Sequence, residues 1–433
     1  MHPPEDTVDQ GFYVQWHVTE RCNQHCSHCY HEHYSGSSEL STSQLLVAWD
    51  KMEAAIRGWG KRAAISLTGG EPFIRKDDAI LPLLARMKSG GIVDGVDILT
   101  NGSLLNDDLC RELADINIVR RIQVSLEGAT PEDNDRIRGE GTFRRTIEAI
   151  ERMKASGLKV AVMMTVSKCN KAHVSDVIEL CSQQGVAAFA LERFMPLGQG
   201  RVNGMEVLSA QEVKEVFSEV YNRSLTTTSP KILLHRPLCG LLAPNDPNVG
   251  AMCSVGINAL TLMHDGTILP CRRLPMVLGN ILTDNIHEIW FESPILWKAR
   301  NPKNLKGKCS ECHLVPICRG CRAMAFALTG NWLASDPHCW MQGNPKKTFS
   351  QPMLLPDARL VNPVGTDVYF AYHRETGTTL ELDRTSHTFL ASLDGDASPY
   401  LIAEKLGIAD GMADSVIESA VRHGFVEEKN PER

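Results

Sequence analysis

The sequence lacks the long apolar run that a membrane span requires. None of its apolar stretches approaches the roughly 18 consecutive residues of a transmembrane helix. The acidic start, residues 1–6, also lacks the basic and apolar parts of a secretory signal peptide. We therefore expect a cytoplasmic protein without a membrane partner.

Excess positive charge is also missing. The formal net charge is −7, and the stretch from Pro352 onward accounts for all of it, with seven Lys and Arg against fourteen Asp and Glu. Surfaces that bind nucleic acid are basic, so a nucleic-acid partner is not expected. The 43% apolar and 22% charged content is ordinary for a soluble globular chain, and 433 residues predict two or three domains.

Cysteine, by contrast, is abundant. Fourteen cysteines would be unusual as disulfides in a reducing compartment, so metal ligation is the better interpretation. Cys22, Cys26 and Cys29 are separated by three and then two residues, just after a strand-like run. One short loop can therefore close around three corners of an iron-sulfur cube and leave the fourth iron open. An open coordination position is what a catalytic metal centre offers to a substrate or cofactor.

This loop resembles the signature of the radical S-adenosylmethionine (SAM) enzymes. The resemblance implies that Cys22, Cys26 and Cys29 are catalytic residues that ligate a 4Fe-4S cluster. In that family the open iron binds the amino and carboxylate groups of SAM, and an electron from the cluster splits SAM to a 5′-deoxyadenosyl radical. An electron donor such as flavodoxin or ferredoxin is therefore an expected partner. His28 occupies the place of a family ring near the adenine, although a solvated loop histidine is an alternative.

From Gly11 to about Ser224, short apolar runs alternate with amphipathic helical stretches, which predicts repeated βα units around a parallel sheet. The α/β fold that the resemblance implies is a partial (βα)6 radical SAM barrel over residues 10–230, with its chemistry at the carboxyl ends of the strands. The expected strands are 12–19, 63–67, 93–99, 121–126, 159–166 and 187–194, and the expected helices include 41–59, 106–116, 142–156 and 172–184.

Polar motifs follow several of these strands. In Thr68-Gly-Gly-Glu-Pro72 the two glycines let the backbone approach a ligand closely. In the family this element holds the SAM amino group. Arg138 resembles the family arginine that pairs with the SAM carboxylate, although it could equally be a solvated residue at the start of a helix. Arg193, after the sixth strand, is a further pocket candidate. The resemblance implies the following cofactor-binding residues: His28, Gly69, Gly70, Glu71, Thr100, Asn101, Ser125, Glu127 and Arg138.

A second cysteine series begins at Cys253. It resembles the SPASM domain of many radical SAM maturases, expected here over residues 231–345, which usually carries two auxiliary 4Fe-4S clusters. The fourth ligand of the first cluster stays open, with Cys239 as the nearest spare upstream cysteine. A zinc ribbon is the alternative for the quartet within 309–321. The resemblance assigns Cys253, Cys271 and Cys321 to the first cluster, and Cys309, Cys312, Cys318 and Cys339 to the second.

A polar connector after Gly343 marks a further boundary. The remainder, 352–430, resembles the winged-helix-like α+β peptide chaperone of pyrroloquinoline quinone biosynthesis, a type of domain that recognises ribosomally made peptides. A DNA-binding winged helix is the rival, and the acidic charge counts against it. Strands are expected at 359–362, 368–373 and 378–382, and helices at 386–393, 399–406 and 412–423.

The leading functional hypothesis is a radical SAM peptide maturase, which abstracts hydrogen from a ribosomally made peptide and installs a crosslink or related modification. The C-terminal domain would bind the leader of that peptide. One alternative is a radical SAM enzyme acting on a small molecule such as a tetrapyrrole, and another is oxidation of a protein in the manner of a sulfatase maturase. The alternative from a different class is an iron-sulfur protein for electron transfer or regulation.

Overall fold

The fold was analysed in a computed structural model that describes residues 11–341 and 352–428, except 245, 247, 311, 313, 316, 364, 365 and 375–377. The chain divides into two compact units, Met1–Ser310 with Ile317–Trp340, and Glu311–Pro316 with Met341–Arg433. The predicted connector after Gly343 lies outside the described residues, apart from Pro352. No helix in the described part of the chain is long and apolar enough to cross a membrane.

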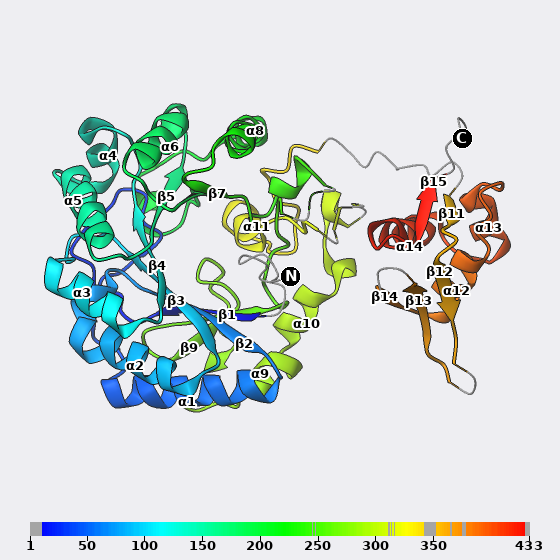
Figure 1. The fold of residues 1–433 in the computed structure, drawn as a ribbon, viewed down its shortest axis with the longest axis horizontal. Coiled ribbons are helices and arrows are strands. Elements are labelled where there is room, and N and C mark those ends of the chain that lie inside the picture. The colour runs from blue at the N-terminus through cyan, green and yellow to red at the C-terminus, as the bar shows by residue number, and fades with distance from the viewer. Residues whose placement is uncertain are drawn as a thin grey trace. The chain divides into compact units, whose positions relative to one another are not determined.

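Six parallel strands form the centre of the first unit. They lie side by side in chain order, and helices cover the outer face of the curved sheet (Figure 1). The predicted α/β architecture with a parallel sheet is confirmed, and every predicted strand overlaps an observed one. The strands are β1 (Gly11–His17), β2 (Arg62–Thr68), β3 (Val93–Thr100), β4 (Val119–Ser125), β5 (Val160–Val166) and β6 (Ala188–Arg193).

Side-chain caps explain where the helices between these strands begin. Ser41 precedes α1 and forms a capping box with Gln44, and Ser209 forms one with Glu212 at the start of α8. Asn106 caps α3 by accepting from the backbone of Leu109. The helices of this part are α1 (Thr42–Gly58), α2 (Leu81–Gly90), α3 (Asp107–Ile116), α4 (Pro131–Arg138), α5 (Thr142–Ala155), α6 (Val174–Gln183), α7 (Gly198–Val202) and α8 (Ala210–Thr226).

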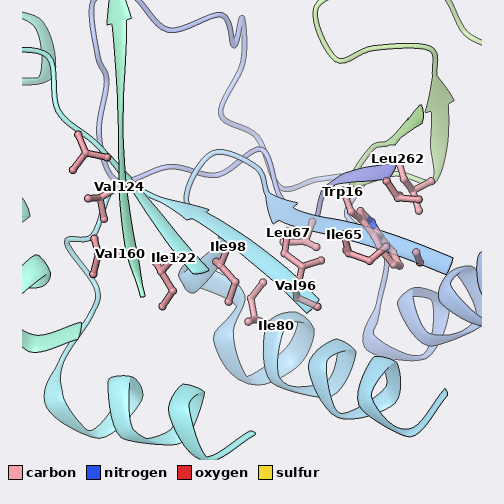
Figure 2. Packing of buried hydrophobic residues seen from close by; sticks show 14 of the residues in the cluster. Trp16, Ile65, Leu67, Ile80, Val96, Ile98, Ile122, Val124, Val160 and Leu262 are labelled. Carbon is pink, nitrogen blue, oxygen red and sulfur yellow. The ribbon is translucent and has the colours of Figure 1, made fainter. Parts of the chain in front are cut away.

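The main core lies between the sheet and these outer helices. Figure 2 shows Ile65, Ile98 and Ile122 on neighbouring strands, pointing to the same side of the sheet. Side chains in a strand alternate between its two faces, so the residues between these apolar positions point into the barrel instead. The outer face therefore stabilises the fold, while the inner face and the carboxyl ends of the strands remain available for chemistry.

Four short strands extend this sheet to ten. β7 (Lys231–Leu233) adds to β6, and β8 (Ala259–Leu262) pairs in parallel with β1, although about 240 residues separate them. β9 (Thr267–Leu269) and β10 (Gly279–Asn280) follow β8 antiparallel. The cysteine series after β7 is thereby attached directly to the first strand of the barrel. The helices of this region are α9 (Ile286–Glu292), α10 (Pro294–Arg300) and α11 (Arg322–Thr329).

The second unit has its own core of residues such as Phe389, Ile417 and Phe425. All three predicted strands and all three predicted helices are present. An antiparallel pair, β11 (Pro352–Leu354) with β15 (Val426–Glu428), was not predicted, because three-residue strands carry no readable period. The other elements are β12 (Ala358–Val361), β13 (Tyr369–His373), β14 (Thr379–Leu382), α12 (Arg384–Ala391), α13 (Pro399–Lys405) and α14 (Asp410–Arg422), with β13 central in its sheet.

Candidate active site

The three cysteines of the predicted catalytic loop converge. They lie in the long connection between β1 and α1, at the carboxyl end of β1. Burial raises the pKa of Tyr34, and Cys29, Cys26 and Cys22 each raise it further, so all three thiols lie within electrostatic reach of one hydroxyl. Burial also raises the pKa of Cys22 to about 11. Iron binds thiolates, so loading this loop with a cluster must release protons.

Backbone contacts fix the shape of this loop. The N–H of Ser27 donates to the carbonyl of Ile137 over 2.8 Å, and the N–H of Gly200 donates to the carbonyl of Cys29 over 3.0 Å. Gly198, at the start of α7, has φ 51°, and a Cβ there would lie 2.4 Å from the carbonyl oxygen of Tyr30. The loop is therefore clamped by segments that follow β4 and β6.

Gly69 and Gly70 pack directly against the start of the loop. Gly69 has φ 154°, and a Cβ would lie 2.3 Å from the carbonyl oxygen of Thr19; at Gly70 it would lie 2.3 Å from that of Arg21. The N–H groups of Gly70 and Glu71 donate to these two carbonyls. Only glycine permits this approach, so the motif after β2 sets the backbone that leads into Cys22.

The Glu71 side chain points toward the end of β3. Its buried carboxylate accepts from the Thr100 hydroxyl over 2.8 Å and from the Asn101 N–H over 2.7 Å, and burial raises its pKa. The Asn101 amide in turn donates to Asn23 over 2.9 Å. Glu71, Thr100 and Asn101 thus form one network that ties the ends of β2 and β3 to the cysteine loop.

A second buried carboxylate joins three elements. Glu127 Oε1 lies 3.1 Å from both Arg138 Nη1 and His28 Nε2, and its Oε2 accepts from the Thr165 N–H over 2.7 Å. Burial alone would raise the pKa of Glu127, but His28 and Arg138 bring it below its usual value. Ser125, the last residue of β4, lies half-buried just before this group.

The arrangement fits the cluster and SAM that the resemblance implies. Arg138 Nε and His28 Nδ1 are buried polar atoms with no hydrogen-bond partner, next to a loop of three thiols. Such atoms match the carboxylate and ring that SAM would present. Within the described residues no three His, Cys, Asp or Glu side chains surround a point as a single ion needs. A cubane holds its ligands farther apart than a single ion does.

The cysteines of the second series separate into two groups. Cys253, Cys271 and Cys321 pack together against a small core that includes Met195 and Leu274. After burial, the charge of Cys253 contributes most to raising the pKa of Cys321 to about 12, and Cys271 contributes as well.

Cys239 lies within electrostatic reach of Cys318. It shares the main core with Cys318, whose thiol accepts a hydrogen bond from the backbone of Leu238, and Cys339 packs on the same core. Cys309 is buried, 4.0 Å from Arg322. Cys312 belongs to Glu311–Pro316, which group with the second unit.

Asp336 is a site residue that the sequence did not reveal. Its carboxylate is buried and accepts two hydrogen bonds from Arg193, over 2.9 and 3.1 Å, and one from the Cys321 N–H over 2.9 Å. Arg193 therefore connects the end of β6 to the second cysteine series. No short motif surrounds Asp336, so its partner 143 residues upstream could not be inferred from sequence.

Comparison with known families identifies the class of protein. Residues 16–181 match the family described as the radical SAM superfamily, and residues 253–322 match SPASM, described as an iron-sulfur cluster-binding domain. The chain therefore belongs to the radical SAM enzymes that carry a SPASM domain. These domains imply 4Fe-4S clusters and SAM as its cofactors.

Named relatives differ in what they act on. The chain is 30% identical over 353 residues to an "AdoMet-dependent heme synthase" of Oleidesulfovibrio alaskensis, covering 77% of this chain and 88% of the relative. It is 29% identical to "Mycofactocin maturase MftC" of Mycobacterium ulcerans, covering 84% and 96%.

Solved structures confirm the fold. The structure of Streptococcus suis SuiB bound to the precursor peptide SuiA matches with TM-score 0.62, at 16% identity over 77% of this chain and 76% of that one. Native anSMEcpe with bound AdoMet matches with TM-score 0.61, at 17% identity over 76% and 94%. The predicted radical SAM fold followed by a SPASM domain is thereby confirmed.

Proposed function

We propose that this enzyme modifies a ribosomally made peptide, by abstracting a hydrogen atom and installing a crosslink or related change. When bound, the cluster and SAM supply the 5′-deoxyadenosyl radical for that step. The chain's own residues bind and orient: Cys22, Cys26 and Cys29 ligate the cluster, and Arg138 offers its free Nε–H to the SAM carboxylate. Glu127 holds Arg138 and His28 in place.

The observation that carries this proposal is the second unit. Its three-stranded sheet leaves β12 and β14 as edges within that sheet, and an edge strand offers backbone donors and acceptors to an extended peptide. Leu401 is 55% exposed on α13 and Met412 is 36% exposed at the start of α14, so apolar anchors are present beside an acidic surface. A leader with basic and apolar residues suits this unit. We infer that it holds the leader and raises the effective concentration of the peptide.

A deletion tests this role. Removing residues 351–433 should weaken peptide turnover far more than SAM cleavage without peptide, because only the first requires the leader. Each variant is incubated anaerobically with SAM, reductant and candidate peptides, and products are read by mass spectrometry. Equal peptide turnover by the truncated and full-length enzymes would show that the second unit does not recognise the peptide. Tight binding of duplex DNA by the second unit would favour a DNA-binding winged helix instead.

A point variant sharpens the same test. The Thr378 carbonyl accepts from His373 on β13, so the N–H of the next residue, Thr379, points to the open side of β14. Thr379→Pro removes this donor without removing a bond within the sheet, whereas Thr379→Val keeps it. Loss of leader binding in the proline variant alone assigns the leader to β14. Loss only in the deletion assigns it to β12.

A tetrapyrrole substrate is the second candidate. Two relatives named heme synthases are 30% identical to this chain over 77% and 75% of its length, which favours this chemistry independently of the second unit. The same anaerobic assay with a propionate-bearing porphyrin in place of peptide separates the two. Loss of mass from the porphyrin, with peptides unchanged, would replace the first proposal.

A further inference from the structure

Four nitrogen-bearing side chains meet behind the cysteine loop. His17 ends β1, His31 follows the last loop cysteine by two residues, His264 follows β8, and Arg272 follows β9. We call these four residues the His–Arg cluster. β1 and β9 both pair with β8, so residues that are far apart in the sequence lie close together.

Contacts through two further residues hold the cluster together. Arg272 Nη2 lies 3.5 Å and His264 Nε2 lies 3.8 Å from the carboxylate of Glu20. The His17 and His31 rings lie 5.9 Å apart between centroids, and the Arg272 guanidinium lies 5.3 Å from the centroid of Tyr30. After burial, the charge of Arg272 is the next largest effect that lowers the pKa of His31, to about 3.

The histidines of the cluster are buried yet incompletely bonded. His17 is 0% exposed, His31 2% and His264 7%. One ring nitrogen of His31 hydrogen-bonds to the backbone of Gly69. Its other ring nitrogen, both of His17, Nδ1 of His264 and Nε of Arg272 have no hydrogen-bond partner. Each buried polar atom left without a partner destabilises the folded state. Folded proteins contain few such atoms, so five in one place indicate a site that a ligand completes.

The groups around the cluster select the kind of ligand. Arg272 is paired with Glu20, while Arg273 and Arg236 share the single carboxylate of Glu192, at 3.1 and 3.5 Å. Within the cluster itself the Arg272 guanidinium is offset by Glu20, so the hydrogen-bond donors that remain decide the kind of ligand. Arg272 Nε can only donate, and each neutral imidazole can donate once. A group with several acceptor lone pairs that suit a guanidinium N–H, namely a carboxylate, matches these donors.

We propose that the His–Arg cluster binds a carboxylate of the peptide substrate, through the Nε–H of Arg272 and a ring N–H of His17. The proposal rests on the proposed function for the identity of the substrate, but the site itself does not. Because His31 lies two residues beyond Cys29, a carboxylate held here places its neighbouring carbon atoms beside the catalytic loop. Specificity for an acidic side chain or a free C-terminus follows.

Glutarate tests the site without any peptide. Anaerobically purified full-length enzyme is heated with glutarate or with its neutral analogue glutaramide, at matched ionic strength. Ligand bound to the folded state raises the unfolding temperature, here by about 1–3 °C with glutarate only. Arg272→Gln should abolish the rise. Arg272→Lys keeps the charge without the Nε–H and should retain only part of it, and the 84% exposed Arg144, changed to Gln, should retain all of it.

The outcomes separate this proposal from the peptide proposal. Equal shifts with glutarate and glutaramide, or a full glutarate shift in both Arg272 variants, overturn the carboxylate site. If the unfolding temperature rises with glutarate only, but the enzyme turns over no peptide, the carboxylate site is supported and the peptide proposal is rejected. Once a peptide is turned over, peptides with a C-terminal amide, or with Asp→Asn or Glu→Gln, identify which carboxylate binds. The peptide that lacks this carboxylate should have a KM raised about tenfold or more with the unmodified enzyme.

Discussion

At the residue scale, Glu127 is the link on which the SAM pocket depends. One of its oxygens contacts both Arg138 and His28, and the other anchors β5 through Thr165. Hydrogen bonds to charged partners contribute about 1.5–3 kcal/mol each. Removing the charge of Glu127 should therefore release the two side chains that we assign to SAM, while leaving the cysteines in place.

Glu127→Gln should weaken SAM binding about tenfold with unchanged iron content. Equilibrium dialysis of SAM against the anaerobic enzyme measures this, with iron determined on the same samples. Glu140→Gln is the matched control, because Glu140 is exposed two residues after Arg138. Unchanged SAM affinity in Glu127→Gln would show that Arg138 and His28 do not hold SAM through this carboxylate.

At the scale of elements, we expect cluster loading to depend on the contact between the glycine turn and the cysteine loop. Gly69→Ala would put a methyl group 2.3 Å from the Thr19 carbonyl, in a backbone region that favours glycine. We expect the variant to lose most SAM cleavage and about four irons per chain. Gly58→Ala, in α1 with nothing within 4 Å of the new Cβ, should retain both. A normal iron content in Gly69→Ala would show that cluster loading does not need this contact.

The start of α8 gives a pH-dependent prediction. Lys171 donates to Glu212 over 2.7 Å, and with the Ser209 cap this lowers the pKa of Glu212 to about 2. A lowered pKa means that the stabilisation is complete at neutral pH and is lost as the pH falls from about 4.5 toward 2. Glu212→Gln should thus destabilise the protein at pH 7 and much less at pH 3, by urea unfolding.

The control for this pH effect is Glu151→Gln, on the exposed surface of α5. It should change the free energy of unfolding little at either pH, since surface substitutions of this kind have small effects. If the cost of Glu212→Gln is the same at pH 7 and pH 3, the lowered pKa does not contribute to the stability of α8.

At the scale of the whole molecule, iron content tests how the cysteines are shared among clusters. Three cubanes predict about twelve irons per chain. Cys253 and Cys271 act on the thiol of Cys321, whereas Cys318 acts on that of Cys239, so we expect Cys321→Ser to lose about four irons and Cys239→Ser to lose none. Anaerobic iron analysis with Mössbauer spectra measures both. Equal loss in the two variants would return Cys239 to the first auxiliary cluster, and zinc in this region would overturn the SPASM assignment.

The sequence by itself determined the catalytic loop, the order of the six strands and the helices between them. These features are local: ligand spacing within one loop, periods of 2 and 3.6 residues, and caps such as Ser41 are written in consecutive residues. Most observed strand ends accordingly fall within two residues of the predicted ones. The motif after β2 is also local, which is why Gly69 and Gly70 could be singled out before their contacts were known.

Only the tertiary structure decided which distant residues meet. It paired β8 with β1 and β11 with β15. It also placed Glu71 against Thr100 and Arg193 against Asp336. It also brought Cys239 near Cys318 and assembled the His–Arg cluster. Such contacts depend on how whole elements pack, because neither loop closure nor burial across hundreds of residues leaves a periodic signal in the chain.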